Sequence, residues 1–189
     1  MAVWIALLRG INVGGRNKVP MQALRDVIER CGGRNVKTYI QSGNLVFMHE
    51  EDDAIALKAL LEDAIAFQFG FPVPVLALPL EQFEELLSFC PYASKPDAEK
   101  NVHCFIYLES PMAKEHLDDA VDLAALDRVA AEREEFTLRQ NVFYLYAPDG
   151  IGRSKLVAQL GRLLGVSTTA RNFKTMRAIA DLAGDFLPN

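Results

Sequence analysis

Cysteine, histidine and tryptophan are all scarce in this chain, and long apolar runs are missing from it. The 189 residues include 3 cysteines, 3 histidines and 1 tryptophan. An odd number of widely separated cysteines predicts no disulfide framework and no zinc site, and it favours a reduced, cytoplasmic compartment. No apolar run is long enough to span a bilayer, so we expect no membrane segment. The run MAVWIALLRG lacks the basic start and the cleavage site of a signal peptide.

Familiar catalytic and metal-binding motifs are missing as well. The sequence holds no HExxH or CxxC spacing, no GxSxG elbow and no assignable pair of carboxylates. We therefore expect no metal, whereas the identity of any cofactor and the question of catalysis stay open. Cys104 lies in an apolar run, which favours packing over nucleophilic reactivity. Ser154 and Lys155 make a poor nucleophile–base pair, because adjacent residues of a helix point apart.

The overall composition, with 50% hydrophobic and 24% charged residues, is typical of a folded globular protein. Apolar runs predict four strands in the first half, over residues 3–8, 36–40, 44–48 and 72–78. Helical spacing of apolar residues predicts helices over 21–31 and 55–65, and one more beginning at Leu80. The order β-α-β-β-α-β over residues 3–78 predicts a ferredoxin-like half within an α+β protein.

The polar, proline-containing stretch 90–100 predicts a boundary, which divides the chain into subdomains 1–90 and 91–189. In the second half we expect an order β-α-β-β-α-α. Its elements are a strand VHCFIYLE, a helix over 113–124, a hairpin turning at Gln140-Asn141, a helix closed by Gly165 and a last helix from Asn172 to Ala183. This order echoes the first half only in part, so an internal duplication stays an open alternative.

Charge is distributed unevenly along the chain. Residues 49–135 hold 20 acidic and 6 basic side chains, whereas the remaining segments hold 5 acidic and 14 basic ones. Residues 150–177 contain six cations and no carboxylate. The simpler interpretation is that surfaces of opposite charge segregate, and the sharper one is a local positive field for an anionic partner. The overall charge of −5 argues against indiscriminate DNA binding.

The loop from Arg9 to Lys18 is both glycine-rich and basic. Glycines let a ligand approach backbone N–H groups, although the spacing matches neither a Walker A loop nor a GxGxxG fingerprint. Candidate ligand contacts in this loop are Arg9, Asn12, Gly14, Gly15 and Lys18. The alternative is a flexible, charged connection. Ser42 and Asn44 add two candidates, although their segment 41–44 is also typical of a plain hairpin turn, and its position relative to the loop stays open.

Two predicted helix starts carry cations where a helix N-terminus prefers carboxylates. Each such charge costs up to about 1 kcal/mol, and a bound anion would reverse the sign. The candidate residues, from segments 150–155 and 168–175, are Gly152, Arg153, Ser154, Lys155, Arg171, Asn172, Lys174 and Thr175. The alternative is ordinary capping by Ser154 and by Thr168 or Thr169, with solvated cations nearby.

Four sequence blocks are similar to those of one bacterial family. LLRGINVGGRNKVPMQALR, TYIQSGNLVF, GIGRSKL and TARNFKT together resemble the bacterial domain of unknown function 1697 family, over nearly the whole chain. The resemblance implies a cytoplasmic α+β protein with a ferredoxin-like half. It brings no function and no catalytic residue. Phe173 stands where many members have a tryptophan.

The expected function is binding of an anionic ligand: a nucleotide, a phosphorylated metabolite or a nucleic acid. An enzyme acting on such a ligand and a non-catalytic interaction or self-association module remain as alternatives, and the sequence predicts no oligomeric state. Four aromatic residues of the predicted strands could form a base-stacking sheet, although packing is their commoner role. They are Tyr39, Phe47, Tyr144 and Tyr146.

Overall fold

Two compact α+β units make up the chain in the computed structural model, which describes residues 1–108 and 121–186. The first unit contains Met1–Glu85 and the C-terminal residues from Arg177 onward, and the second contains Leu86–Met176. Each sheet has four antiparallel strands, which confirms the α+β fold class. No helix in the described part of the chain is both long and apolar enough to cross a membrane.

Both junctions between the units fall inside helices, namely α3 (Leu80–Ser88) and α8 (Phe173–Gly184). The sequence placed a single junction between residues 90 and 91, in the stretch that carries proline and polar residues. A helix that continues from one unit into the next leaves no such change in composition. The composition therefore gives no indication that the C-terminal residues belong to the first unit.

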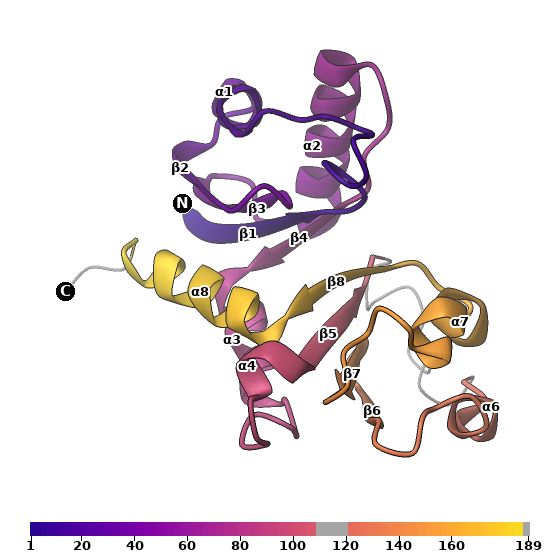
Figure 1. Cartoon of the computed structure of the whole chain (residues 1–189). Helices are drawn as coiled ribbons and strands as arrows, with labels where there is room; N and C mark the ends of the chain where they lie inside the picture. The colour runs from indigo at the N-terminus through magenta and orange to yellow at the C-terminus, as the bar shows by residue number, and fades with distance from the viewer. Residues whose placement is uncertain (109–120, 187–189) are drawn as a thin grey trace. The chain divides into compact units, whose positions relative to one another are not determined.

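The first unit has the predicted order β-α-β-β-α-β (Figure 1). Its elements are β1 (Ala2–Leu8), α1 (Met21–Arg30), β2 (Arg34–Tyr39), β3 (Asn44–His49), α2 (Ala54–Phe69) and β4 (Val75–Pro79). The strands are ordered β2-β3-β1-β4 in the sheet. Alternate residues of β1, among them Trp4 and Leu8, join a buried core with Leu24 of α1 and Leu57 of α2. The two helices therefore cover one face of this sheet.

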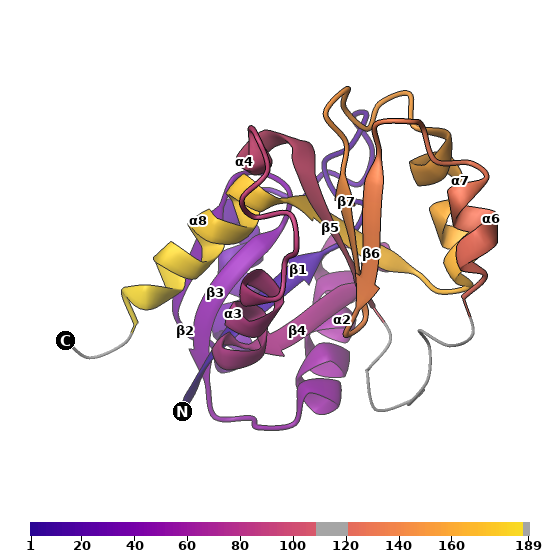
Figure 2. The same cartoon turned by 90° about the horizontal axis from the view of Figure 1, so that it is seen from below.

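The second unit contains two short helices, which the sequence did not locate, and two hairpin-linked strands, which it did. Its elements up to the last strand are α4 (Ala98–Asn101), β5 (Val102–Tyr107), α6 (Leu123–Asp127), β6 (Glu135–Arg139), β7 (Val142–Tyr146) and α7 (Lys155–Leu164). Gln140 and Asn141 both have positive φ, as a tight two-residue hairpin turn requires. The predicted helix 113–124 falls mostly outside the described residues. Leu126 and Leu160 place α6 and α7 on the same core (Figure 2).

The last helix, α8, begins at Phe173, close to the predicted Asn172, but the strand that precedes it was not predicted. Thr168–Asn172 forms a strand, β8, which pairs antiparallel with β5 so that Arg171 lies opposite Cys104. The buried positions of β8 are the polar Thr169 and Arg171. Their alternation therefore lacks the apolar signal by which a strand is usually recognised. The second sheet has the order β6-β7-β5-β8, which repeats the strand order of the first.

A fall in pH below neutrality is expected to destabilise the second unit through His103. This residue lies in β5 between Leu145 of β7 and Asn172 of β8, and burial lowers the pKa of its imidazole. The unfolded chain, with a histidine pKa of about 6.5, therefore binds the proton more readily than the folded chain. Stability that is present above about pH 6.5 is lost as the pH falls toward the lower pKa of the folded state. Urea unfolding at pH 7.5 and 5.5 should show a smaller loss for His103→Gln than for the wild-type chain, and equal losses would contradict the assignment.

Candidate functional site

Residues 12–17 of the glycine-rich loop form a miniature hairpin. The Asn12 N–H donates to the Asn17 carbonyl oxygen (3.0 Å), and the Arg16 N–H donates to the Val13 carbonyl oxygen (3.1 Å). Gly14 and Gly15, with φ of 57° and 76°, occupy the two central positions of the turn. A turn with both central φ values positive is one that glycine adopts without strain. Both glycines therefore have a structural role, whether or not they also contact a ligand.

Asn12 holds this hairpin against the neighbouring turn. Its side-chain amide donates to the carbonyl oxygens of Val19 (3.0 Å) and Gln41 (2.8 Å), and its Oδ1 accepts from the Val19 N–H (2.9 Å). The Leu8 N–H also donates to the Gly43 carbonyl oxygen (2.8 Å). The loop after β1 and the β2–β3 turn thus lie side by side, which settles the arrangement that the sequence left open.

Ser42 and Asn44 contribute to the turn itself. Asn44 is 1% exposed, and its amide donates to the Tyr39 carbonyl oxygen (2.9 Å) and to the Ser42 hydroxyl (3.0 Å). Both contacts close the turn that joins β2 to β3. The side chains of Ser42 and Asn44 are less exposed to solvent than those of Arg9, Arg16 and Lys18 in the adjacent loop.

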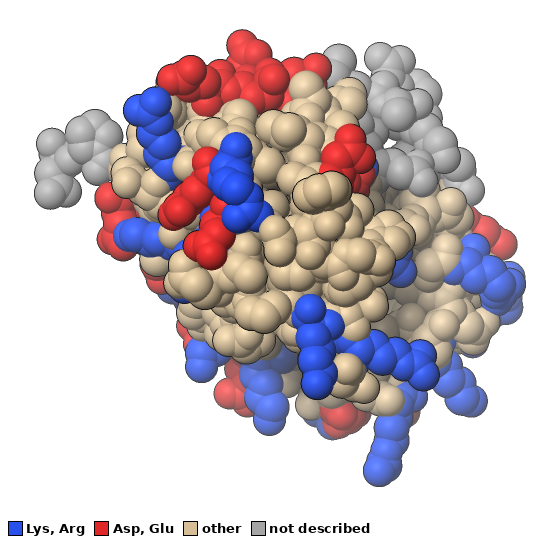
Figure 3. All heavy atoms as spheres, turned by 90° about the horizontal axis from the view of Figure 1, so that it is seen from above, with Lys and Arg blue, Asp and Glu red and all other residues tan. Residues whose placement is uncertain are grey.

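Three cations project from this fixed backbone. Arg9, Arg16 and Lys18 are exposed, and none of them makes an ion pair within the described ranges 1–108 and 121–186. We call these three residues the loop cations. The space-filling view shows Lys and Arg side chains standing out from the surface, with Asp and Glu side chains elsewhere and between them (Figure 3). Exposed cations of this kind create a local positive field at the surface.

In the second unit, the side chain of the N-cap residue Ser154 caps the start of α7. The Ser154 Oγ accepts from the Val157 N–H (3.1 Å), and Gly150 with φ of 81° turns the chain into the helix. Arg153 and Lys155 flank the cap and make no ion pair among the residues that the structure describes. The first turn of α7 holds no carboxylate. The capping alternative therefore accounts for Ser154, while the exposed cations beside it have no described counter-charge.

Arg171 has a different position from the one predicted. It is 9% exposed within β8, and burial lowers its pKa to about 10. Its guanidinium donates to the Thr169 hydroxyl (3.1 Å) and to the Ala170 carbonyl oxygen (2.8 Å). It is therefore a buried strand residue and not a cation of a helix start. Asn172 caps the following helix by accepting from the Thr175 N–H (2.9 Å), which leaves Lys174 as the cation of the first turn of α8.

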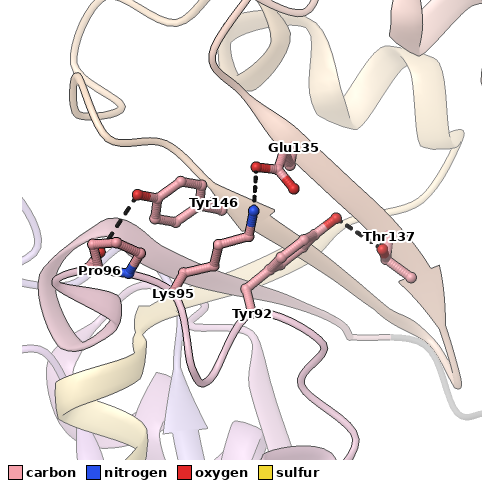
Figure 4. Close-up of polar contacts among 6 residues, drawn as sticks. All are labelled: Tyr92, Lys95, Pro96, Glu135, Thr137 and Tyr146. Carbon is pink, nitrogen blue, oxygen red and sulfur yellow. Dashed lines mark hydrogen bonds and ion pairs between the residues drawn. The ribbon is translucent and has the colours of Figure 1, made fainter.

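A polar cluster that the sequence did not predict fastens residues 92–96 to β6 and β7 (Figure 4). The Tyr92 and Thr137 hydroxyl groups are 2.8 Å apart, and the Lys95 ammonium lies 2.6 Å from the Glu135 carboxylate. The same ammonium lies 5.5 Å from the centre of the Tyr146 ring. These contacts link distant positions without any periodic pattern, so only the folded arrangement reveals them. Tyr146 therefore packs within the protein and does not form part of an open stacking surface.

The cysteines and the acidic residues give no indication of a metal centre. Within residues 1–108 and 121–186, no three His, Cys, Asp or Glu side chains gather closely enough to hold a metal ion. A hydrogen bond with the Cys90 thiol, followed by burial, raises the pKa of Cys104 well above its usual value. Cys104 is therefore held as a neutral thiol inside the second unit.

The fold and these loops define an α+β protein whose basic segments project from two antiparallel sheets. Comparison with known proteins identifies the family: the model of the family described as protein of unknown function (DUF1697) matches residues 1–144, so the chain belongs to this family. It is also similar to a solved structure of a conserved bacterial protein from Streptococcus pneumoniae, with 26% sequence identity and a TM-score of 0.74. That similarity covers 96% of this chain and 98% of the other. Comparison with curated proteins gives no match.

Proposed function

We propose that this protein binds an anionic, phosphate-containing ligand through the loop cations Arg9, Arg16 and Lys18. The supporting observation is that three cations without described ion pairs project from a backbone that Asn12 holds in place. A preorganised loop loses less conformational freedom on binding than a flexible one. The Gly14 and Gly15 N–H groups, which donate to no described acceptor, could add contacts to phosphate oxygens.

The ligand class follows from charge and from the aromatic residues. Nucleotides, phosphorylated metabolites and nucleic-acid ends share the phosphate group that such cations recognise. Nonspecific binding along DNA is disfavoured by the net charge of −5. In the ferredoxin-like arrangement we propose for the units, RNA binding would use aromatic residues on an open sheet. Phe47 and Tyr144 are fully buried here, which favours a compact phosphorylated ligand over a stacked RNA strand.

The second unit carries an independent candidate for the same chemistry. Arg153 and Lys155 stand beside the capped start of α7, where the helix dipole adds to their positive field. The cap already uses the Ser154 hydroxyl, so the ligand would be bound by the two cations and by free backbone N–H groups of the first turn. Each unit can be tested separately.

Charge reversal in the first unit is expected to weaken phosphate binding by about 10-fold or more, because charge-assisted hydrogen bonds each contribute about 1.5–3 kcal/mol. The measurement is calorimetric titration of the full chain with pyrophosphate and with ATP, using the double variant Arg16→Glu/Lys18→Glu. The control is Arg34→Glu, which reverses an exposed cation on β2 that already faces Glu50 at 3.9 Å. For the second unit, Arg153→Glu/Lys155→Glu is compared with Arg162→Glu on the same helix.

Three outcomes have distinct meanings. Affinity that drops only in the first-unit variant assigns the site to the loop cations, and affinity that drops only in the second-unit variant moves it to α7. Absence of any phosphate-dependent binding at low salt, where screening is weakest, would overturn the proposal. Consumption of a bound phosphorylated compound would identify the protein as an enzyme acting at this site.

A further inference from the structure

Helix α2 is apolar on the side that faces away from its own core. Its inner residues, such as Leu57 and Leu61, are fully buried against the first sheet. On its outer side, Ile55, Leu60 and Phe67 remain 57%, 42% and 94% exposed. A helix that covers one face of a sheet normally presents polar residues to water. An apolar outer side indicates a second partner, because large exposed apolar patches mark interaction surfaces.

The outer side has a self-complementary order of side chains. Six residues at helical spacing form what we call the outer stripe, with Leu60 at its margin: Ile55, Ala56, Ala59, Asp63, Ala66 and Phe67. A large residue followed by a small one opens the stripe, and a small residue followed by a large one closes it. When two copies lie antiparallel about the middle of α2, Ile55 meets Phe67 of the second copy, and Ala56 meets Ala66 of the second copy. A two-fold interface requires this reciprocity, in which each contact occurs twice.

Charge at the two ends of α2 favours the same arrangement. Asp52 and Asp53 are exposed at its N-terminal end. At its C-terminal end, the Arg30 guanidinium donates to the Gln68 side-chain oxygen (2.6 Å). An antiparallel pair therefore brings Asp52 and Asp53 of one copy toward Arg30 of the other, twice. The single charge within the stripe, Asp63, falls opposite Ala59 of the second copy and not opposite another carboxylate.

We propose that this protein forms a two-fold symmetric dimer in which α2 packs antiparallel against α2 of a second copy. The alanines of the stripe allow the two helices to approach closely, and Ile55 and Phe67 close the two ends of the contact. The outer stripe shares no residue with the loop cations, so the dimer can be tested whether or not the protein binds phosphate.

Sedimentation equilibrium of the full chain tests the dimer. The wild-type protein should sediment as a dimer, and Phe67→Glu and Ile55→Glu should each raise the dissociation constant at least about 10-fold, as truncation of an interface anchor does. Gln22→Glu, which adds the same charge on exposed α1, should leave the dimer intact. Asp63→Ala should tighten it, because it removes the only charge from the stripe. Thermal melting confirms that each variant is folded, since these exposed positions do not support the core.

Cross-linking tests the antiparallel direction. In a Cys31→Ser background, Ala56→Cys chains and Ala66→Cys chains are oxidised separately and after mixing. The two positions are about 15 Å apart along one helix, so in an antiparallel pair two identical positions lie too far apart to be linked. Efficient linkage in the mixture alone supports the antiparallel dimer. Linkage within each separate variant would indicate a parallel pair, and a wild-type chain that sediments as a monomer would assign this face to a different protein; either result overturns the proposal.

Discussion

Replacing Gly43 with alanine is expected to lower the free energy of unfolding by about 3 kcal/mol or more. Gly43 has a φ of +74°, and a Cβ atom there would lie 2.6 Å from the Leu8 Cβ and 2.8 Å from the Ile11 Cδ1. Leu8 and Ile11 are both buried, so neither can move aside without disturbing the first core. The backbone cannot relax freely either, because the Gly43 carbonyl oxygen accepts from the Leu8 N–H. Urea unfolding of the full chain measures the change.

Gly70→Ala is the matched control for this prediction. Gly70 has a similar φ of +79°, but a Cβ atom there would meet nothing within 4 Å. This variant should therefore show only the backbone strain, about 1–2 kcal/mol. The difference in unfolding free energy between the two variants therefore measures the cost of the steric clash where the β2–β3 turn approaches β1. Equal losses would mean that the turn can shift away from Leu8, contrary to the packing described above.

The second large effect is expected for Asn12→Ala, which should cost about 2–4 kcal/mol of stability. The substitution removes the two bonds donated by the amide and the one accepted from Val19. The Val19 N–H then loses its acceptor beside a side chain that is 1% exposed, and alanine must adopt the φ of 54° that asparagine tolerates better. Hydrogen exchange at the Val19 amide should accelerate together with the loss in stability.

Asn17→Ala provides the comparison for Asn12. Asn17 has a similar φ of 49°, but its side chain makes a single described bond, to the Gly10 carbonyl oxygen (3.0 Å). It should therefore cost less than Asn12→Ala. If the two variants were equally unstable, the link between the hairpin and the β2–β3 turn would contribute nothing beyond the local turn.

Much of the first unit was predictable because its side chains follow a regular period. The alternation in β1 and the helical spacing in α1 both place apolar residues in one core, and the predicted turn at Ser42-Gly43 joins β2 to β3. β8 was missed because Thr169 and Arg171, its inward residues, are polar. Arg171 was consequently assigned to the wrong kind of site. A strand with polar inward positions cannot be distinguished from a capped helix start by hydrophobicity alone.

In the candidate site, the exposure of the cations could be expected from composition, whereas the geometry of the loop could not. The basic loop does present Arg9 and Lys18 at the surface, as expected from its charges. The role of Asn12 was not foreseen, because its partners Val19 and Gln41 become neighbours only when β1 and β3 pair. A local signal did exist for the hairpin: two consecutive glycines, between Val13 and Arg16, are typical of a turn that needs two positive φ values.

The division of the first unit between both ends of the chain determines the order in which the protein can fold on the ribosome. The nascent chain delivers β1 to β4 first, but this unit also contains the residues from Arg177 onward, which are synthesised after the second unit. Asp185, for example, pairs with Lys37 of β2 at 3.0 Å. The second unit, Leu86–Met176, is complete before those residues are made. Biosynthesis therefore begins the first unit early and completes it only after the second, so a chain released prematurely at any point before its last helix carries an unfinished first unit.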